Sequence, residues 1–268
     1  MFAIENIAQL IRQKRSCLCV GLDPDLQKIP KHLLNEKDPV FEFNKQIIDA
    51  TYPFAVAYKP NMAFYEALGA KGWETLYKTA EYLPKDTFRI ADAKRGDIGN
   101  TSEMYAKAFF EEMQFDAITV APYMGEDSVK PFLAFPNKWV ILLALTSNMG
   151  STDFEQQTLQ NGKKLYEEVL EKSKQWADHK QIMYVVGATK SEFFQHIRSI
   201  VAKNFLLVPG IGKQGGDLEE VMKLGLNDNI GLLINSSRDI IYAGEGRDFA
   251  QESARKAKKI QEQMASFL

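Results

Sequence analysis

The sequence predicts an α/β fold, a single-domain (β/α)8 barrel of the TIM type, and three observations support this. Eight short apolar segments recur along the chain, with amphipathic segments between them. The apolar segments are almost continuously hydrophobic, which is typical of parallel strands that are covered by helices. The length of 268 residues suits one barrel of ~250 residues. A doubly wound sheet is the alternative, because periodicity alone does not show whether a sheet closes.

Each predicted strand is a short run rich in Val, Ile, Leu and Phe. In chain order, the predicted strands cover residues 17–22, 54–58, 88–91, 117–120, 140–145, 182–186, 205–208 and 231–234. Helical periodicity is clearest over residues 40–50, 101–113, 162–176, 216–224 and 248–267. A short N-terminal helix precedes the first strand. Because the sequence shows no linker or low-complexity segment, we expect one domain over residues 1–268.

The composition excludes several classes of partner. Hydrophobic residues at 45% and charged residues at 25% are average for a soluble protein. A net charge of −2 provides no field that would attract nucleic acid or an anionic membrane. The longest apolar run, residues 139–145, is far shorter than the ~20 residues of a membrane span. Cys17 and Cys19 are too close in sequence for a comfortable disulfide. We interpret them as small buried residues of a cytoplasmic protein.

The segment around residues 88–97 is the most informative for chemistry. Strand alternation places Phe88, Ile90, Asp92 and Lys94 on one face, with Asp97 just beyond the strand. A lysine near two carboxylates stays charged, which makes it a poor base or nucleophile but a good positioned acid. A structural ion pair at the end of a strand explains this pattern equally well.

Charged residues also end the first and second predicted strands. Asp23 follows the first strand, and Lys59 follows the second. In a barrel, these strand ends meet at the same mouth as Asp92 and Lys94, where barrel enzymes keep their active sites. Each residue alone has the alternative interpretation of a solvated loop charge.

The last third of the sequence predicts a phosphate site. Residues 209–217 form a glycine-rich loop after the seventh predicted strand, and glycines let backbone N–H groups approach an anion. Ser236, Ser237 and Arg238 follow the eighth strand and offer hydroxyls and a guanidinium. Loops after strands seven and eight often hold a phosphate in barrels.

No metal or redox site is predicted. His32, His179 and His196 have no ligand spacing, and we interpret them as surface residues. The segment after the first strand does not match the glycine fingerprint of dinucleotide-binding folds.

At this point the sequence resembles a known family. Residues 91–101, Ala-Asp-Ala-Lys-Arg-Gly-Asp-Ile-Gly-Asn-Thr, look like the signature of orotidine 5′-phosphate decarboxylases of the longer bacterial type. The resemblance extends through residues 20–24, 59–61, 145–148, 209–217 and 236–238. The Asp-x-Lys-x-x-Asp core is shared with a metal-dependent sugar-phosphate decarboxylase. That relative carries an acidic metal ligand where this chain has Lys59.

The resemblance implies a reaction that uses neither a cofactor nor a metal. Orotidine 5′-monophosphate would lose CO2 to form uridine 5′-monophosphate (UMP) in de novo pyrimidine biosynthesis. Lys94 would protonate C6 of the pyrimidine, and Asp92, Lys59 and Asp97 would complete a charge network around it. The family is a homodimer with shared sites, so Asp97, Ile98 and Thr101 would reach the neighbouring subunit's substrate.

The resemblance also implies substrate contacts. Asp23 and Lys59 would hold the ribose hydroxyls, with Asn61 close by. Ser147 would contact the pyrimidine amide. Gln214 and Arg238 would grip the phosphate, and Ser237 stands beside Arg238. A phosphosugar isomerase or aldolase, and a catalytically inactive nucleotide-binding barrel, are the more distant alternatives.

Overall fold

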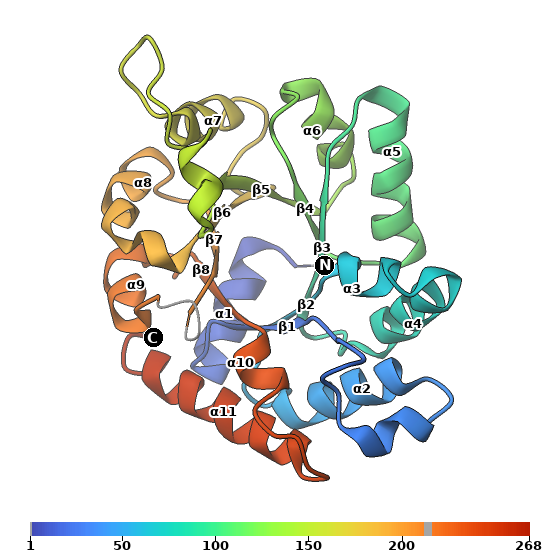
Figure 1. Ribbon diagram of the computed structural model, residues 1–268. Coiled ribbons are helices and arrows are strands. Elements are labelled where there is room, and N and C mark those ends of the chain that lie inside the picture. The colour runs from blue at the N-terminus through green and yellow to red at the C-terminus, as the bar shows by residue number, and fades with distance from the viewer. Residues whose placement is uncertain (1, 212–215) are drawn as a thin grey trace.

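The strands close into a complete barrel. The computed structural model describes residues 2–211 and 216–268, in which eight parallel strands pair in chain order (Figure 1). Closure occurs where β8 pairs with β1, with Cys19 opposite Asn235. The predicted barrel is therefore confirmed, and the doubly wound alternative is wrong. The strands are β1 Leu18–Leu22, β2 Ala57–Pro60, β3 Phe88–Arg95, β4 Ala117–Val120, β5 Trp139–Leu145, β6 Ile182–Val186, β7 Leu206–Pro209 and β8 Leu232–Ser236.

The strand ends differ from the prediction where polar residues belong to the barrel. β3 continues to Arg95, beyond the predicted end at residue 91, because it resumes pairing with β4 after an irregularity, with Arg95 opposite Val120. β8 likewise includes Asn235 and Ser236. Hydrophobicity ends the predicted strands too early, because the backbone ladder does not depend on side-chain polarity.

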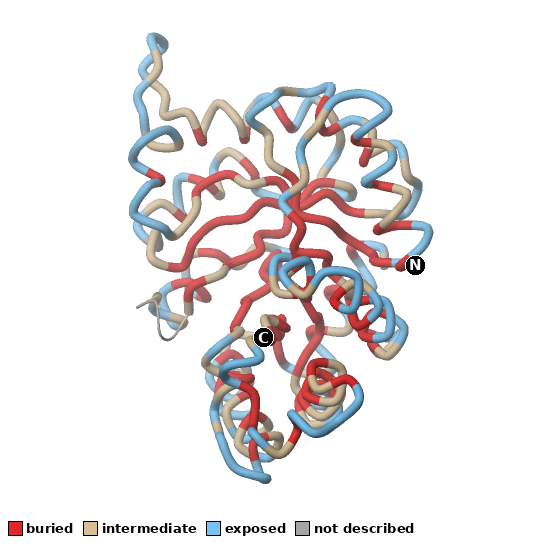
Figure 2. Tube along the Cα trace, turned by 45° about the vertical axis from the view of Figure 1, so that its right-hand side comes forward, coloured by how far each residue is buried: buried red, intermediate tan, exposed pale blue. Residues whose placement is uncertain are grey.

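Helices surround the barrel and bury one face each (Figures 1 and 2). The helices are α1 Ile4–Lys14, α2 Pro39–Thr51, α3 Met62–Glu66, α4 Gly69–Tyr82, α5 Gly99–Lys107, α6 Glu126–Leu133, α7 Leu165–Ser173, α8 Phe194–Ile200, α9 Leu218–Gly225, α10 Arg238–Ile241 and α11 Phe249–Met264. The helix predicted from residue 162 begins only at Leu165, because Thr158 and Lys164 form an isolated antiparallel bridge. Glu167 then accepts a hydrogen bond from the Lys164 backbone N–H at 2.7 Å, which caps α7.

The N-terminal segment covers the amino-terminal end of the barrel. The Phe2 carbonyl accepts a hydrogen bond from Trp139 Nε1 at 2.8 Å. The Phe2 ring packs edge-on against the Phe88 ring, with centroids 5.7 Å apart. Phe88 and Trp139 begin β3 and β5. The predicted N-terminal helix is confirmed as α1, and the open mouth is the carboxyl-terminal end of the strands.

Several minor predictions are tested by the burial of side chains. Cys17 and Cys19 are both buried and unpaired, as predicted. His196 is exposed and lies 2.7 Å from Glu167, whereas His32 and His179 are half-buried. Within the described ranges, no helix is long and apolar enough to span a membrane.

Candidate active site

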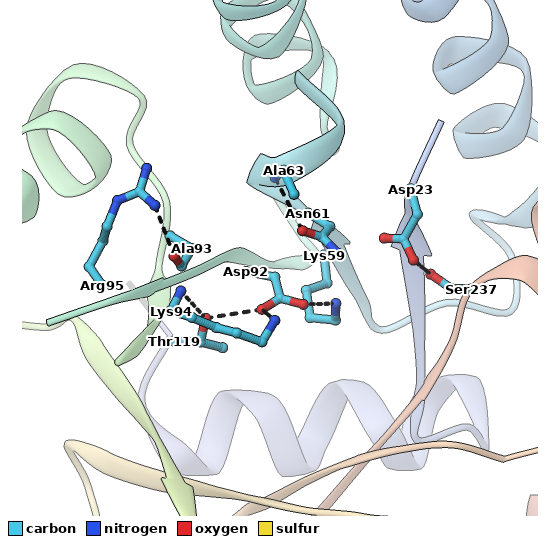
Figure 3. A network of polar contacts seen from close by, with 10 residues as sticks. All are labelled: Asp23, Lys59, Asn61, Ala63, Asp92, Ala93, Lys94, Arg95, Thr119 and Ser237. Atoms are coloured by element: carbon cyan, nitrogen blue, oxygen red, sulfur yellow. Dashed lines mark hydrogen bonds and ion pairs between the residues drawn. The ribbon is translucent and has the colours of Figure 1, made fainter. Parts of the chain in front are cut away.

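Three charged side chains form a network at the carboxyl-terminal mouth of the barrel (Figure 3). Lys59 belongs to β2, and Asp92 and Lys94 belong to β3. The Asp92 carboxylate lies between the two ammonium groups: Lys59 Nζ donates to its Oδ2 at 2.5 Å, and Lys94 Nζ donates to its Oδ1 at 2.6 Å. The fold thus brings together three of the four residues predicted to be catalytic.

Burial makes the charges of this network interdependent. Lys59 is 4% exposed and Asp92 is 8% exposed. Burial alone would raise the pKa of Asp92, but Lys59 and Lys94 outweigh it and hold that pKa well below its usual range. Burial would likewise lower the pKa of Lys59, but Asp92 and Asp23 outweigh it and raise the pKa above its ordinary value. Asp92 and Lys59 are therefore both charged near neutral pH.

Thr119 on β4 holds the network in place, and the sequence analysis did not identify it. Its hydroxyl donates to Asp92 Oδ1 at 3.1 Å and accepts from the Lys94 backbone N–H at 2.9 Å. Lys94 has a φ of 45°, a left-handed conformation that is strained for a residue with a side chain. Thr119 stabilises that conformation, which directs the ammonium group back to Asp92. The available signal in the sequence was that Thr119 is the single polar residue within the apolar run 117–120.

Asp23 follows β1 and faces the same mouth (Figure 3). Ser237 Oγ donates to Asp23 Oδ2 at 2.6 Å, whereas Asp23 Oδ1 is buried with no hydrogen-bond partner among the described residues. A Cβ on Gly21 would lie 1.9 Å from Ser237 Oγ, so only glycine permits this approach. A buried carboxylate oxygen without a donor is suited to accept a hydrogen bond from a ligand hydroxyl.

A cavity of about 360 Å³ opens above Asp92 and Asp23. Six predicted site residues line it: Asp23, Lys59, Asn61, Asp92, Ser237 and Arg238. Residues 209–211 of the predicted glycine-rich loop also line it. Four residues that were not predicted complete the wall: Lys28, Phe64, Asn235 and Asp239. Most of the lining residues are polar or charged, and convergent polar groups fix the orientation of a small-molecule ligand.

The other predicted residues that the structure describes, Lys94 among them, do not line this cavity. Asp97 Oδ1 accepts from the Ile98 backbone N–H at 2.8 Å, and Asp97 forms no ion pair with either lysine of its own chain among the described residues. The Ile98 side chain is 55% exposed, and Thr101 is exposed at the start of α5. Half-buried Ser147 follows β5 and packs against Gly187. Gln214 lies outside the described residues.

Comparisons with known proteins identify the family of this chain. The family model described as "Orotidine 5'-phosphate decarboxylase / HUMPS family" matches residues 16–253. The orotidine 5′-phosphate decarboxylase of Flavobacterium johnsoniae is 62% identical over 268 residues, which cover 98% of this chain and 97% of that protein.

Solved structures show the same barrel. Leishmania donovani OMP decarboxylase aligns with a TM-score of 0.81 and 36% identity, covering 97% of this chain and 99% of that chain. Leishmania donovani UMP synthase aligns with a TM-score of 0.82 and 38% identity. This match covers 95% of this chain but only 56% of the UMP synthase chain. With the matched family model, the identity over nearly the whole length and the shared barrel, this chain belongs to the orotidine 5′-phosphate decarboxylase / HUMPS family.

Proposed function

We infer that this chain removes CO2 from orotidine 5′-monophosphate to form UMP. The chain is an enzyme of pyrimidine biosynthesis, a carboxy-lyase, as the identity to orotidine 5′-phosphate decarboxylases over almost its full length supports. The structural observation that carries this conclusion is the Lys59–Asp92–Lys94 network, in which Lys59 and Asp92 are buried and line the cavity. The metal-dependent sugar-phosphate relative has an acidic ligand where Lys59 stands here.

We propose that Lys94 is the proton donor. When the bond between C6 and the carboxylate breaks, its electron pair remains on C6 of the pyrimidine, and CO2 leaves. Asp92 Oδ1 accepts a hydrogen bond from Lys94 Nζ at 2.6 Å, and this contact positions the ammonium group from which a proton passes to C6. Fixed charges that surround the developing carbanion lower the barrier because they need no reorganisation during the reaction.

The other predicted residues orient the nucleotide in this proposal. Asp23 accepts from a ribose hydroxyl through its unpaired Oδ1, with Ser237 orienting the carboxylate from the other oxygen. Lys59 and Asn61 lie beside the ribose, and Ser147 contacts the pyrimidine amide. Gln214 and Arg238 hold the phosphate, and of these two Arg238 is a described residue that lines the cavity. Binding of the phosphate, which is remote from C6, helps to position C6 for the reaction.

A direct assay tests the activity. The absorbance of orotidine 5′-monophosphate is followed over time with the purified protein, with and without a chelator. We expect conversion to UMP at the same rate in both conditions. An unchanged spectrum would refute the proposed function, and loss of activity on chelation would favour the metal-dependent relative.

Arg238→Ala tests the phosphate site. Arg238 lines the cavity and has no ion-pair partner among the described residues, so its guanidinium is available to an anion. Loss of this charge-assisted contact should weaken UMP binding by ~2–4 kcal/mol. Uridine, which lacks the phosphate, is the matched ligand and should bind the variant and the wild type alike. Unchanged UMP binding in calorimetry would place the phosphate elsewhere.

We also propose a homodimer with shared active sites. Asp97 makes no ion pair with Lys59 or Lys94 of its own chain among the described residues, and the apolar side chains of Ile98, Met104 and Met124 are about half exposed. Met124 Cε lies 4.0 Å from the position that a Cβ on Gly96 would occupy, so Met124 flanks the Asp97 loop, and Met104 belongs to α5, which follows that loop. This supports a second subunit that covers the loop and receives Asp97, Ile98 and Thr101.

Mixing two inactive variants tests the shared site. Lys94→Ala and Asp97→Ala homodimers should each be inactive. In a mixed dimer, one site carries both defects and the other carries neither. Subunit exchange at equal concentrations should therefore restore about one quarter of the wild-type activity. Absence of recovery, with exchange verified by native mass spectrometry, would show that each chain supplies its own Asp97.

We further propose that residues 1–268 form one domain and that the protein is cytoplasmic. The two ends of the chain are tied together, since Arg15 donates to the Ala265 carbonyl at 2.9 Å and Gln261 donates to the Lys14 carbonyl at 3.1 Å. The unpaired cysteines support a reducing compartment.

A further inference from the structure

A second cavity lies directly beside the candidate substrate cavity. Its volume is about 720 Å³, and its walls come from residues 27–32, from α10 and from residues 245–247. Lys28 and Arg238 line both cavities, so the two spaces share a wall at the proposed phosphate site.

The second cavity concentrates positive charge. Five basic side chains line it, together with a single acidic one, Glu245. The basic side chains are Lys28, Lys31, His32, Arg238 and Arg247. Lys28 pairs with Asp25 at 3.0 Å, whereas Lys31, Arg238 and Arg247 have no ion-pair partner in the described part of the chain. In a protein of net charge −2, this local excess of unpaired cations favours an anionic ligand.

Hydrogen bonds fix the wall of this cavity relative to the substrate site. The Tyr242 hydroxyl donates to the Asp23 carbonyl at 2.8 Å and accepts from the Asp25 backbone N–H at 2.7 Å. The Tyr242 ring stacks on Phe43, with centroids 5.8 Å apart. The loop that carries Lys28 and Lys31 is therefore anchored to the end of the barrel that holds Arg238. A preorganised wall loses less conformational entropy when an anion binds.

We propose that the second cavity binds the phosphoryl groups that extend beyond the 5′-phosphate of a pyrimidine nucleoside triphosphate. This inference rests on the proposed function, in which Arg238 holds the 5′-phosphate of the nucleotide. The additional phosphates pass Arg238 and Lys28 and reach Lys31 and Arg247, which are suited to phosphate oxygens. Such a nucleotide fills both cavities and competes with the substrate. UTP, made from the product by phosphoryl transfer, then inhibits its own synthesis at this site.

Inhibition constants of UMP, UDP and UTP against orotidine 5′-monophosphate test the proposal. The assays use a chelator and a constant ionic strength, so that neither metal nor screening differs between ligands. UTP should inhibit competitively and at least about tenfold more tightly than UMP, the order expected for an additional contact to a charged group. UDP should fall between them.

A pair of double variants assigns the effect to the cavity. Lys31→Ala/Arg247→Ala should leave the KM for substrate unchanged and bring the UTP and UMP constants within about threefold of each other. The control variant Lys258→Ala/Arg255→Ala also removes one lysine and one arginine, here from the exposed face of α11. It should keep the wild-type difference between the UTP and UMP inhibition constants.

Two results would overturn the inference. One is equal inhibition by UTP and UMP in the wild type. The other is an equal loss of the UTP advantage in both double variants, which would indicate a general charge effect. A wild-type protein without decarboxylase activity would instead refute the proposed function. The cavity would then be tested by calorimetric titration of UTP into the wild type and the two double variants, where only Lys31→Ala/Arg247→Ala should lose binding.

Discussion

Lys94→Ala should abolish measurable turnover of orotidine 5′-monophosphate while UMP binding stays within about tenfold of the wild type. The variant loses both the proposed proton donor and one fixed positive charge of the network, contributions that together should exceed about 10⁴-fold in rate. Binding changes little because the Lys94 side chain is 52% exposed and the cavity walls are formed by other residues. Single-turnover kinetics and calorimetry with UMP measure the two effects separately.

Lys94→Arg is the matched control for this prediction. It keeps the positive charge beside Asp92, but a guanidinium with a pKa above about 12 donates a proton poorly. We expect Lys94→Arg to fold normally and to remain far less active than the wild type. If either variant retained near wild-type turnover, Lys94 would not be the acid.

Asp92→Asn should destabilise the fold by about 3–5 kcal/mol and also abolish activity. Lys59 is 4% exposed, and its ammonium would lose the carboxylate that lies 2.5 Å away. Removing one partner of a buried ion pair leaves an uncompensated charge, which is more unfavourable than removing both. Chemical denaturation measures the free energy of unfolding.

The double variant Lys59→Met/Asp92→Asn separates stability from catalysis. It removes the buried charge together with its partner, so it should unfold at a higher denaturant concentration than Asp92→Asn alone. Activity should stay absent, because the positioned charges are gone. A double variant no more stable than the single one would show that the ion pair does not determine stability here.

The difference in stability between the wild type and Asp92→Asn should depend on pH, because it depends on the pKa of Asp92. Its pKa in the folded protein is lowered by Lys59 and Lys94, against the effect of burial, below the ordinary value near ~3.9. The stabilising contribution of the carboxylate is therefore fully present above about pH 5 and is lost as the pH falls toward the folded-state pKa. The difference in stability between wild type and Asp92→Asn should be constant from about pH 5 to 8 and shrink below about pH 4.

Much of the site could be predicted from the sequence because parallel strands end at a common edge. Asp23, Lys59, Asp92 and Lys94 each stand at the end of an apolar run, and barrel closure places such ends around one mouth. The eight strands could be predicted from the hydrophobic pattern for a second reason. Strands that are buried on both faces must be apolar along their whole length.

Only the tertiary structure decided which charges meet. The sequence placed Lys94 near two carboxylates, but Asp92 alone pairs with it in the described chain, because the left-handed backbone at Lys94 turns the side chain back along the strand. Thr119 holds that conformation from 25 residues away in sequence. Ser237 orients Asp23 across 214 residues, through a gap that Gly21 leaves open. Periodicity contains no information on such contacts, because they depend on strand register and side-chain reach after the barrel has closed.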